Sequence, residues 1–495
     1  MNPLADLLLA ATAVDPDRLA VRAPDGVDWT YAELEAHSAA AAAMLVERGV
    51  RPGDRVVVAT AKSAAALAVI LGCTRVGAVL VPLSPAFPDA ELARLVTDAD
   101  PAALVVDAGR HVDALDLAPG VTTIPLSPRS PTRPGGSLAT PVDAPRVPAD
   151  PAAVVYTSGT TGAPKGAVLS HGALVASATT LASAWGMTAD DVLLHVLPLD
   201  HVHGLFVAAQ TILAVGGTLL LEPRFDVDRA VALLPGATVL MGVPTHYARL
   251  LLHPGFDRAS AGSLRLLTSG SAPMSAALHR AVEERTGLQV LERYGMTETC
   301  ILTSNPLHGE RRPGSVGQPL PGVSVRVVDG EGAESAPGAV GHVQVRTPCA
   351  FDGYWRRPEL TRDWLSTDGW IRTGDLGRVD ADGYLTLVGR EKDLVITGGL
   401  NVYPADVERV LDAQPEVAES AVVGLPDDDL GERLVAVVVP APGHVVDPDD
   451  LVARLRADLA GYQVPRDVRV VAALPRNAMG KVQKQRLRAD PPPPR

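Results

Sequence analysis

The chain has 495 residues, of which 47% are apolar and 20% charged, a composition typical of a globular protein with roughly two to four domains. Its 57 acidic residues outnumber its 44 basic ones, and the resulting net charge of −13 disfavours nucleic acid and anionic membranes as partners. Three cysteines without a CxxC pair argue against a disulfide framework or a cysteine-based metal site. An N-terminus without the basic region of a signal peptide, and no apolar stretch suited to a membrane span, predict a reduced, cytoplasmic protein.

Residues 28–83 predict a first α/β unit, and one more strand and a loop follow before residue 150. Thr30 and Glu33 have the spacing of a capping box at the start of an alanine-rich helix. Helices that alternate with continuous apolar strands predict a parallel sheet covered on both faces. The expected elements are a helix over 31–46, a strand over 56–59, a helix that ends at Leu71, strands over 77–82 and 104–107, and an exposed loop over the Pro- and Gly-rich residues 119–150.

A glycine- and hydroxyl-rich stretch runs from Tyr156 to Gly166, after a short β-prone segment. Its three glycines allow the backbone N–H groups to face one concavity, which suits a polyphosphate. Hydroxyl groups and one ammonium group add further donors, from Thr157, Ser158, Thr160, Thr161 and Lys165. The stretch is not a Walker A loop, because Pro164 precedes the lysine and no Ser or Thr follows it. Phosphate binding is favoured over a flexible linker, because apolar segments flank the stretch on both sides.

The pattern changes twice after this stretch. Residues 167–171 are expected to open a helix, and strands are predicted over 192–196, 217–221, 238–241 and 264–268. From about 315 onward, apolar residues alternate at period two between Asp-Gly turns, which predicts a small antiparallel sheet or barrel. A last unit, from about 393 to 488, is expected to contain a helix near 404–413 and strands at 420–423 and 434–439.

Six further segments carry polar residues that could take part in chemistry: 200–205, 292–299, 372–376, 389–393, 397–401 and 476–481. Each is a weak signal by itself. Asp375 follows Thr-Gly and could simply form a turn, and a lysine near the C-terminus such as Lys481 is commonly a surface charge. His201 and His203 lack a third ligand for zinc.

In this order and spacing, the segments together with the phosphate stretch resemble the adenylate-forming superfamily of acyl-CoA synthetases, peptide-synthetase adenylation domains and luciferases. The resemblance extends from about Thr30 to Lys484 and is closest to the malonyl-CoA synthetase family. That closer likeness rests on Glu292–Thr299 with Thr303–Pro306, Val316-Gly317 with Leu320–Val323, Lys392–Gly399, Asn401–Pro404 and Leu474–Asn477.

The resemblance implies a mixed α/β fold. A large N-terminal domain of stacked α/β sheets, residues 1–390, would include a β-barrel-like subdomain at about 315–390. A small, mobile α+β domain would follow over 391–488, and residues 489–495 would form a disordered tail. The C-terminal domain would rotate about Lys392 between the two half-reactions. Gly398 and Gly399 would then line the path of coenzyme A, although outside the motif they read as an ordinary turn.

The resemblance also implies an acid–thiol ligase that uses ATP, Mg²⁺ and coenzyme A. A carboxylate would attack the α-phosphate of ATP to give an acyl-adenylate, and the thiol of coenzyme A would then displace AMP. The implied catalytic residues are Lys481, Glu298, Thr157 and Lys165, and the implied magnesium ligands are Glu298 and Thr161. The implied nucleotide-binding residues are Thr157, Ser158, Gly159, Thr160, Thr161, Gly162, Lys165, Gly270, Ser271, Ala272, Pro273, Glu292, Arg293, Tyr294, Gly295, Met296, Thr297, Asp375, Arg390 and Lys481.

The acid substrate is predicted to be malonate or a 2-substituted malonate. Its distal carboxylate would need a buried partner, because an unpaired buried charge is costly. Arg293 and His201 are the expected partners, with Ser269 and Met296 also at the acyl pocket; the alternative is that Arg293 is a structural charge paired with Glu292 or another acid. Two departures from the family pattern are Asp200, where relatives have an aromatic or apolar residue, and the apolar segment 300–302, where a polar one is expected. Both are compatible with a different or substituted acid.

Other readings of the same residues stay open. The protein could activate a short- or medium-chain or aryl monocarboxylate, or it could load a separate carrier protein, since the chain has no phosphopantetheine site of its own. A catalytically silent nucleotide-binding relative is a further alternative, against which the joint presence of Lys481, Glu298 and Asp375 argues. A monomer or a homodimer is expected.

Overall fold

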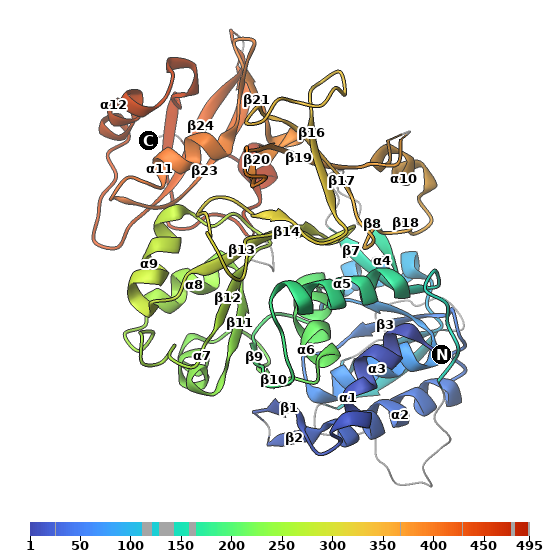
Figure 1. Ribbon diagram of the computed structural model, residues 1–495. Helices are drawn as coiled ribbons and strands as arrows, with labels where there is room; N and C mark the ends of the chain where they lie inside the picture. The colour runs from blue at the N-terminus through green and yellow to red at the C-terminus, as the bar shows by residue number, and fades with distance from the viewer. Residues whose placement is uncertain are drawn as a thin grey trace.

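The computed structural model describes residues 1–24, 26–110, 121–127, 143–157, 165–366, 368–427, 429–476 and 481–493. These residues form four β-sheets, two of them large and covered by helices (Figure 1). Among the described residues, no helix combines the length and the hydrophobicity needed to cross a bilayer.

The first large sheet has seven strands in the order β18-β8-β7-β4-β3-β5-β6. Its central strands are parallel, whereas β8 runs antiparallel to β7 and β18 antiparallel to β8. The strands are β3 (Arg55–Ala59), β4 (Val79–Pro82), β5 (Ala103–Asp107), β6 (Thr122–Leu126), β7 (Pro151–Thr157), β8 (Lys165–Ser170) and β18 (Gly353–Tyr354).

The second large sheet has nine strands in the order β15-β14-β13-β12-β11-β9-β10-β1-β2, and those from β13 to β1 are parallel. Its strands are β1 (Leu19–Ala23), β2 (Val27–Thr30), β9 (Val192–His195), β10 (Thr218–Leu221), β11 (Val239–Gly242), β12 (Leu266–Ser269), β13 (Val290–Met296), β14 (Cys300–Ser304) and β15 (Gln318–Pro319).

The two sheets share one core because alternate side chains of each strand point to opposite faces. Leu80 and Leu193 belong to a cluster that includes residues of the helices between the sheets, whereas their neighbours Val81 and Leu194 pack on the outer faces. The inner helices are α1 (Pro3–Val14), α2 (Tyr31–Glu47), α3 (Ala64–Val76), α5 (His171–Ala184) and α6 (Gln210–Ala214). The outer ones are α4 (Asp89–Ala99) on the seven-stranded sheet, and α7 (Val227–Leu233), α8 (Pro244–Leu251) and α9 (Ala276–Thr286) on the nine-stranded sheet.

Two smaller sheets follow. Strands β16 (Ser324–Val328), β17 (Gly341–Arg346), β19 (Ile371–Val379) and β20 (Leu385–Arg390) form an antiparallel sheet, and α10 (Pro358–Trp364) precedes β19. The last sheet contains β21 (Val395–Thr397), β22 (Leu400–Val402), β23 (Val417–Asp427), β24 (Gly431–Pro440) and β25 (Asp467–Val470). Its helices are α11 (Pro404–Leu411), α12 (Pro448–Asp458) and α13 (Lys484–Ala489).

Most of the expected elements are present, including the capping box. The Thr30 hydroxyl accepts from the Glu33 N–H at 3.2 Å, and the Glu33 carboxylate accepts from the Thr30 N–H at 2.8 Å. Because both orphan donors at the start of α2 are satisfied, the helix begins where the sequence places it.

Two expectations were wrong. Residues 167–170 do not open a helix but belong to β8, where Ala167 and Leu169 are fully buried, and α5 begins only at His171. A short apolar segment of this kind fits a strand and a helix equally well by its pattern. The expected loop over 119–150, of which 119–120 and 128–142 lie outside the described residues, is not a loop throughout, because β6 pairs in parallel with β5 and buries Ile124 and Leu126. Its Pro125 is tolerated because β6 lies at the edge of the sheet.

Candidate active site

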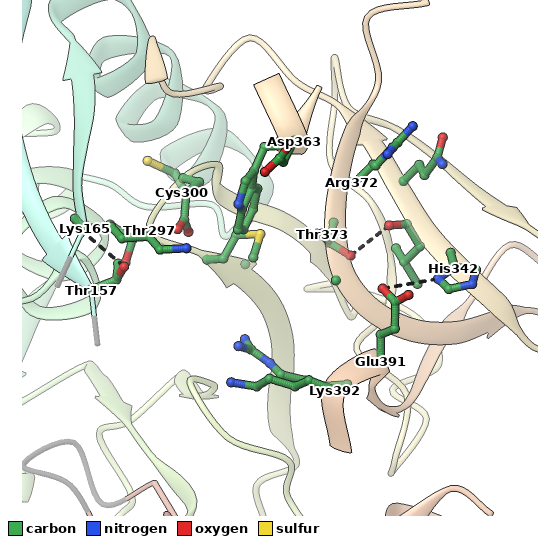
Figure 2. Close-up of a pocket in the computed structure, with 18 of the residues that line it drawn as sticks. Thr157, Lys165, Thr297, Cys300, His342, Asp363, Arg372, Thr373, Glu391 and Lys392 are labelled. Atoms are coloured by element: carbon green, nitrogen blue, oxygen red, sulfur yellow. Dashed lines mark hydrogen bonds and ion pairs between the residues drawn. The ribbon is translucent and has the colours of Figure 1, made fainter. Parts of the chain in front are cut away.

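A cavity of about 930 Å³ lies where β7, β13 and the turn after β13 meet the β16–β17 region and the residues that follow β20. Ligands of α/β proteins commonly bind outside the carboxyl ends of parallel strands, and β7 and β13 end here. Lys165 and Lys392 extend into the cavity from opposite sides (Figure 2). The predicted site residues that line it are Thr157, Lys165, His201, Ser271, Arg293, Gly295, Met296, Thr297, Glu298, Arg390, Lys392 and Lys481.

Other predicted residues lie around or away from this cavity. Ser269, Gly270, Glu292, Tyr294 and Asp375 are not among the lining residues but adjoin or contact residues that are. Ala272, Pro273, Gly398 and Gly399 are also not part of the lining. The predicted residues Ser158, Gly159, Thr160, Thr161 and Gly162 lie outside the described residues.

Glu298 sits in the tight connection between β13 and β14. The hairpin brings Gly295 so close to Cys300 that a β-carbon on Gly295 would lie 2.0 Å from the Cys300 carbonyl oxygen. Glu298 is 4% exposed, and its carboxylate accepts a hydrogen bond of 2.6 Å from the Tyr354 hydroxyl. Burial raises the pKa of Glu298.

Asp375 is held by two neighbours at the edge of the cavity. The Tyr294 hydroxyl donates to Oδ2 at 2.5 Å, and Arg390 Nε lies 3.0 Å from Oδ1. Because Asp375 and Arg390 face each other in the register of β19 and β20, the antiparallel pairing itself brings the two charges together. A carboxylate fixed in this way is suited to accept hydrogen bonds from ribose hydroxyls.

Arg293 is buried yet incompletely satisfied. It is 4% exposed, and a β-carbon at Gly270 would lie 2.4 Å from its Nη1, so the guanidinium needs a glycine at that position. Its Nε and Nη2 have no hydrogen-bond partner within the described ranges. Burial lowers the pKa of Arg293 to about 10, so the side chain still carries a positive charge at neutral pH.

The alternative pairing of Arg293 with Glu292 does not form. The Glu292 carboxylate instead accepts from the backbone N–H groups of Met274, at 3.3 Å, and Gly314, at 3.1 Å. Burial raises the pKa of Glu292 to about 7. Adjacent residues in a strand point to opposite faces, which is why neighbours in the sequence do not meet here.

The two histidines differ in their surroundings. The His201 side chain is 30% exposed, and its Nε2 lies 3.7 Å from Asp200 Oδ2. His203 is buried, and its Nδ1 lies 3.2 Å from Ser271 Oγ, a contact between residues 68 positions apart that no local pattern indicates. Ser271 has a φ of 67°, in the left-handed region that is unfavourable for residues with a β-carbon. The site therefore contains a strained serine held by a buried histidine.

Lys481 lines the same cavity as Arg390 and Lys392 and is accessible from it. The surrounding protein lowers the pKa of Lys481 to about 8 by desolvation, and the nearby charges of Arg390 and Lys392 contribute in the same direction, against Asp375. This lysine, nearly 200 residues from the glutamate of the β13–β14 turn in sequence, thus shares one cavity with it.

The lowered pKa of Lys481, about 8, predicts a pH dependence of the reaction. If cationic Lys481 attracts the phosphates of ATP, deprotonation of this lysine should weaken that attraction. The value of kcat/KM for ATP in adenylate formation should then fall about tenfold per pH unit above pH about 8, because the pH dependence of kcat/KM reports pKa values of the free enzyme. Pyrophosphate release at subsaturating ATP, from pH 6 to 10, measures the decline. An alkaline limb at the same pH in Lys481→Arg would contradict this, because arginine stays charged throughout the range.

Gly398 and Gly399 form the exposed turn of the hairpin between β21 and β22. Both have positive φ, 56° and 78°, as a two-residue hairpin turn of the primed type requires. In this arrangement the two residues are a turn, as their pattern outside the motif suggested.

The donor set also fits a magnesium ion bound together with phosphates. No group of three or more His, Cys, Asp or Glu side chains that could hold a metal is found in the described part of the chain. Glu298 nevertheless presents a buried carboxylate to the cavity. Mg²⁺ commonly uses one or two carboxylates and completes its shell with substrate phosphates and water, so a single glutamate fits that mode of binding.

The family comparisons cover most of the chain. The model of the AMP-binding enzyme family matches residues 9–355, and that of the AMP-binding enzyme C-terminal domain matches residues 406–481. Among characterised relatives, the indoleacetate–CoA ligase of Aromatoleum aromaticum is 36% identical, over 96% of this chain and 95% of its own. The malonate–CoA ligase of Arabidopsis thaliana is 33% identical, over 95% of this chain and 86% of its own.

A solved structure extends the likeness to the whole fold. MatB from Rhodopseudomonas palustris with ATP bound is 44% identical, covers 99% of both chains and superposes with a TM-score of 0.94, whereas its apo form gives 0.84. The arrangement described here is thus closer to that of the ATP-bound form. The protein belongs to the AMP-binding enzyme family, in which it is an ATP-dependent, AMP-forming acid–CoA ligase of mixed α/β fold.

Proposed function

We propose that the protein converts malonate, or a malonate substituted at carbon 2, into the corresponding CoA thioester through an acyl-adenylate. The observation that carries this proposal is the buried Arg293 in the wall of the cavity, with two nitrogens that have no hydrogen-bond partner among the residues that the structure describes. A buried charge without a partner costs free energy, and a dicarboxylate offers a second anionic group that removes the cost.

Two other residues of the cavity support an anionic rather than an apolar substrate. His201 and Ser271 line the same cavity and can donate hydrogen bonds to a carboxylate. The guanidinium can bind both carboxylate oxygens at once, which makes recognition directional. A long-chain acid would leave these groups desolvated and unpaired, so the same pocket disfavours it.

We assign the nucleotide to other residues in and around the cavity. Asp375 and Arg390 would bind the ribose, and Thr157, Lys165 and the stretch after Thr157 would bind the β- and γ-phosphates. Lys481 would lie between the attacking carboxylate and the α-phosphate and offset the charge that develops there. Glu298, together with Thr161, would hold Mg²⁺, which supplies charge neutralisation at the phosphates when bound.

Thioester formation would need a second arrangement of the chain. Lys392 directly follows Glu391 at the start of the C-terminal part and is the assigned hinge, since a few residues at an element boundary can absorb a domain rotation. Rotation would take Lys481 out of the cavity and bring Gly398 and Gly399 toward it. Without side chains, these glycines would leave room for the pantetheine arm of coenzyme A.

Assays of both half-reactions with a panel of acids test the proposed substrate. Pyrophosphate release and CoA-thioester formation should be highest with malonate or methylmalonate and at least about tenfold lower with acetate, octanoate, benzoate and indoleacetate, because only the dicarboxylates pair with Arg293. Octanoate, benzoate or indoleacetate as the best substrate would replace the dicarboxylate assignment with a monocarboxylate one. Adenylate formation without any thioester would indicate a carrier protein as acceptor.

A further inference from the structure

A short segment, residues 351–357, lies between the strand that begins at Lys165 and the turn that contains Glu298, and it is bonded to both; we call this segment the strap. Its strand β18 pairs with β8, which begins at Lys165 (Figure 1). The Trp355 N–H donates to the Gly166 carbonyl at 2.7 Å, and the Phe351 N–H donates to the Glu298 carbonyl at 2.8 Å. The strap is therefore bonded by its backbone both to the strand of the phosphate-binding lysine and to the turn of the buried glutamate.

Tyr354, in the middle of the strap, repeats this connection with its side chain. It is 5% exposed and lines the cavity. Its hydroxyl donates to Glu298 Oε1 at 2.6 Å, and the Lys165 ammonium lies over its ring, 5.5 Å from the centroid. Edge contacts with Phe351 and Trp364, at centroid distances of 5.1 and 5.7 Å, fix the plane of the ring.

The C-terminal end of the strap, at Arg357, is also held by hydrogen bonds. Arg357 Nη2 donates to Asp98 Oδ1 at 2.7 Å, and the Tyr156 hydroxyl donates to Asp98 Oδ2 at 2.6 Å. Tyr156 immediately precedes Thr157, at the point where β7 enters the cavity. Asp98 thus fixes the strap to the strand that leads into the phosphate-binding stretch, so Tyr354 has little freedom to move relative to that strand.

We propose that Tyr354 is a positioning residue for the nucleotide, a role that rests on the proposed functions of Glu298 and Lys165. Its hydroxyl occupies one carboxylate oxygen of Glu298 and leaves the other for the metal of the Mg²⁺–ATP complex. Its ring holds the Lys165 ammonium over the cavity by a cation–π contact. One side chain thereby sets the distance between a metal ligand and a phosphate ligand.

Two substitutions of Tyr354 distinguish the effect of its hydroxyl from the effect of its ring. Tyr354→Phe keeps the ring and its contact with Lys165 but removes the hydrogen bond to Glu298. Tyr354→Leu removes both. The control is Tyr384→Phe, which deletes a hydroxyl that donates to the Glu310 carbonyl at 2.8 Å and is not part of the cavity lining.

The measurement is calorimetric binding of α,β-methylene-ATP, without acid or coenzyme A, in saturating Mg²⁺ and again in EDTA. In Tyr354→Phe the gain in affinity due to Mg²⁺ should fall about tenfold, the loss expected for a hydrogen bond to a charged group, while affinity in EDTA stays within about twofold. Tyr354→Leu should lose affinity in EDTA as well, and Tyr384→Phe should match the wild type in both conditions.

Three other results would each contradict a specific assignment. An unchanged Mg²⁺ effect in Tyr354→Phe, with a reduced one in Glu298→Gln, would overturn the positioning role and leave the assignment of Glu298 intact. An unchanged effect in both variants would overturn the assignment of Glu298 itself. Equal losses in Mg²⁺ and in EDTA for Tyr354→Phe would mean that the hydroxyl supports the fold and not the metal ligand.

Discussion

Replacement of Lys481 by alanine should lower the rate of adenylate formation about 10²–10³-fold, the usual cost of removing a group that stabilises developing charge in a transition state. Lys481 lines the cavity together with Arg390, Lys392 and Glu298, where we propose that its ammonium acts on both reacting groups. Single-turnover formation of the acyl-adenylate from malonate and ATP measures this rate.

The second half-reaction provides the control for Lys481. When chemically prepared malonyl-adenylate is supplied, Lys481→Ala should form the CoA thioester at close to the wild-type rate, because the proposed rotation removes this lysine from the cavity. Lys484 lies in α13, and its Nζ is 2.6 Å from Oε1 of Glu408 in α11. Lys484→Ala should leave adenylation nearly unchanged. Equal losses in the two half-reactions would assign Lys481 to stability or to both steps.

Arg293→Ala should lower kcat/KM for malonate about 10²–10⁴-fold, since loss of one partner of a buried ion pair costs about 3–5 kcal/mol. Activity with acetate should change far less, because acetate has no distal carboxylate to lose its partner. Pyrophosphate release with each acid measures the two effects.

Arg293→Lys sharpens this test. It keeps the positive charge but cannot bind both carboxylate oxygens in the same plane, so malonate activity should lie between those of the wild type and Arg293→Ala. Parallel losses with malonate and acetate in both variants would show that Arg293 supports the pocket as a whole and does not select the substrate.

Local signals predicted much of this fold. The capping box at Thr30 and Glu33 marked the start of α2, and continuous apolar strands marked the parallel sheets. The motif order identified residues as distant as Thr157 and Lys481, which line one cavity. These successes share a cause: each rests on a pattern within a few residues or on a motif met in a fixed order.

The wrong predictions and the missed contacts depend on residues that are far apart in the sequence. Whether residues 167–170 are strand or helix depends on pairing with β7, and β6 depends on pairing with β5, neither of which the local pattern contains. The contact between Tyr354 and Glu298 spans 56 residues, and that between His203 and Ser271 spans 68. His203 could have been noticed beside His201, but no local signal pointed to Tyr354.

Arg293 and Glu292 are adjacent in sequence but do not pair. Its neighbour Glu292 suggested an ion pair, yet the backbone places the two side chains in different surroundings, and the glutamate is satisfied by backbone N–H groups. Sequence adjacency within a strand is therefore a poor guide to charge pairing, because adjacent residues face apart.

In the proposed function, a distal carboxylate bound by Arg293 selects the substrate. The most direct test of this selection compares kcat/KM for malonate and for malonamate, which has nearly the same shape but carries a neutral amide in place of that carboxylate. The wild type should prefer malonate by about 10²-fold, as expected for a buried charge-assisted pair, and Arg293→Ala should reduce this preference to nearly one. Similar values for the two acids in the wild type would contradict the claim.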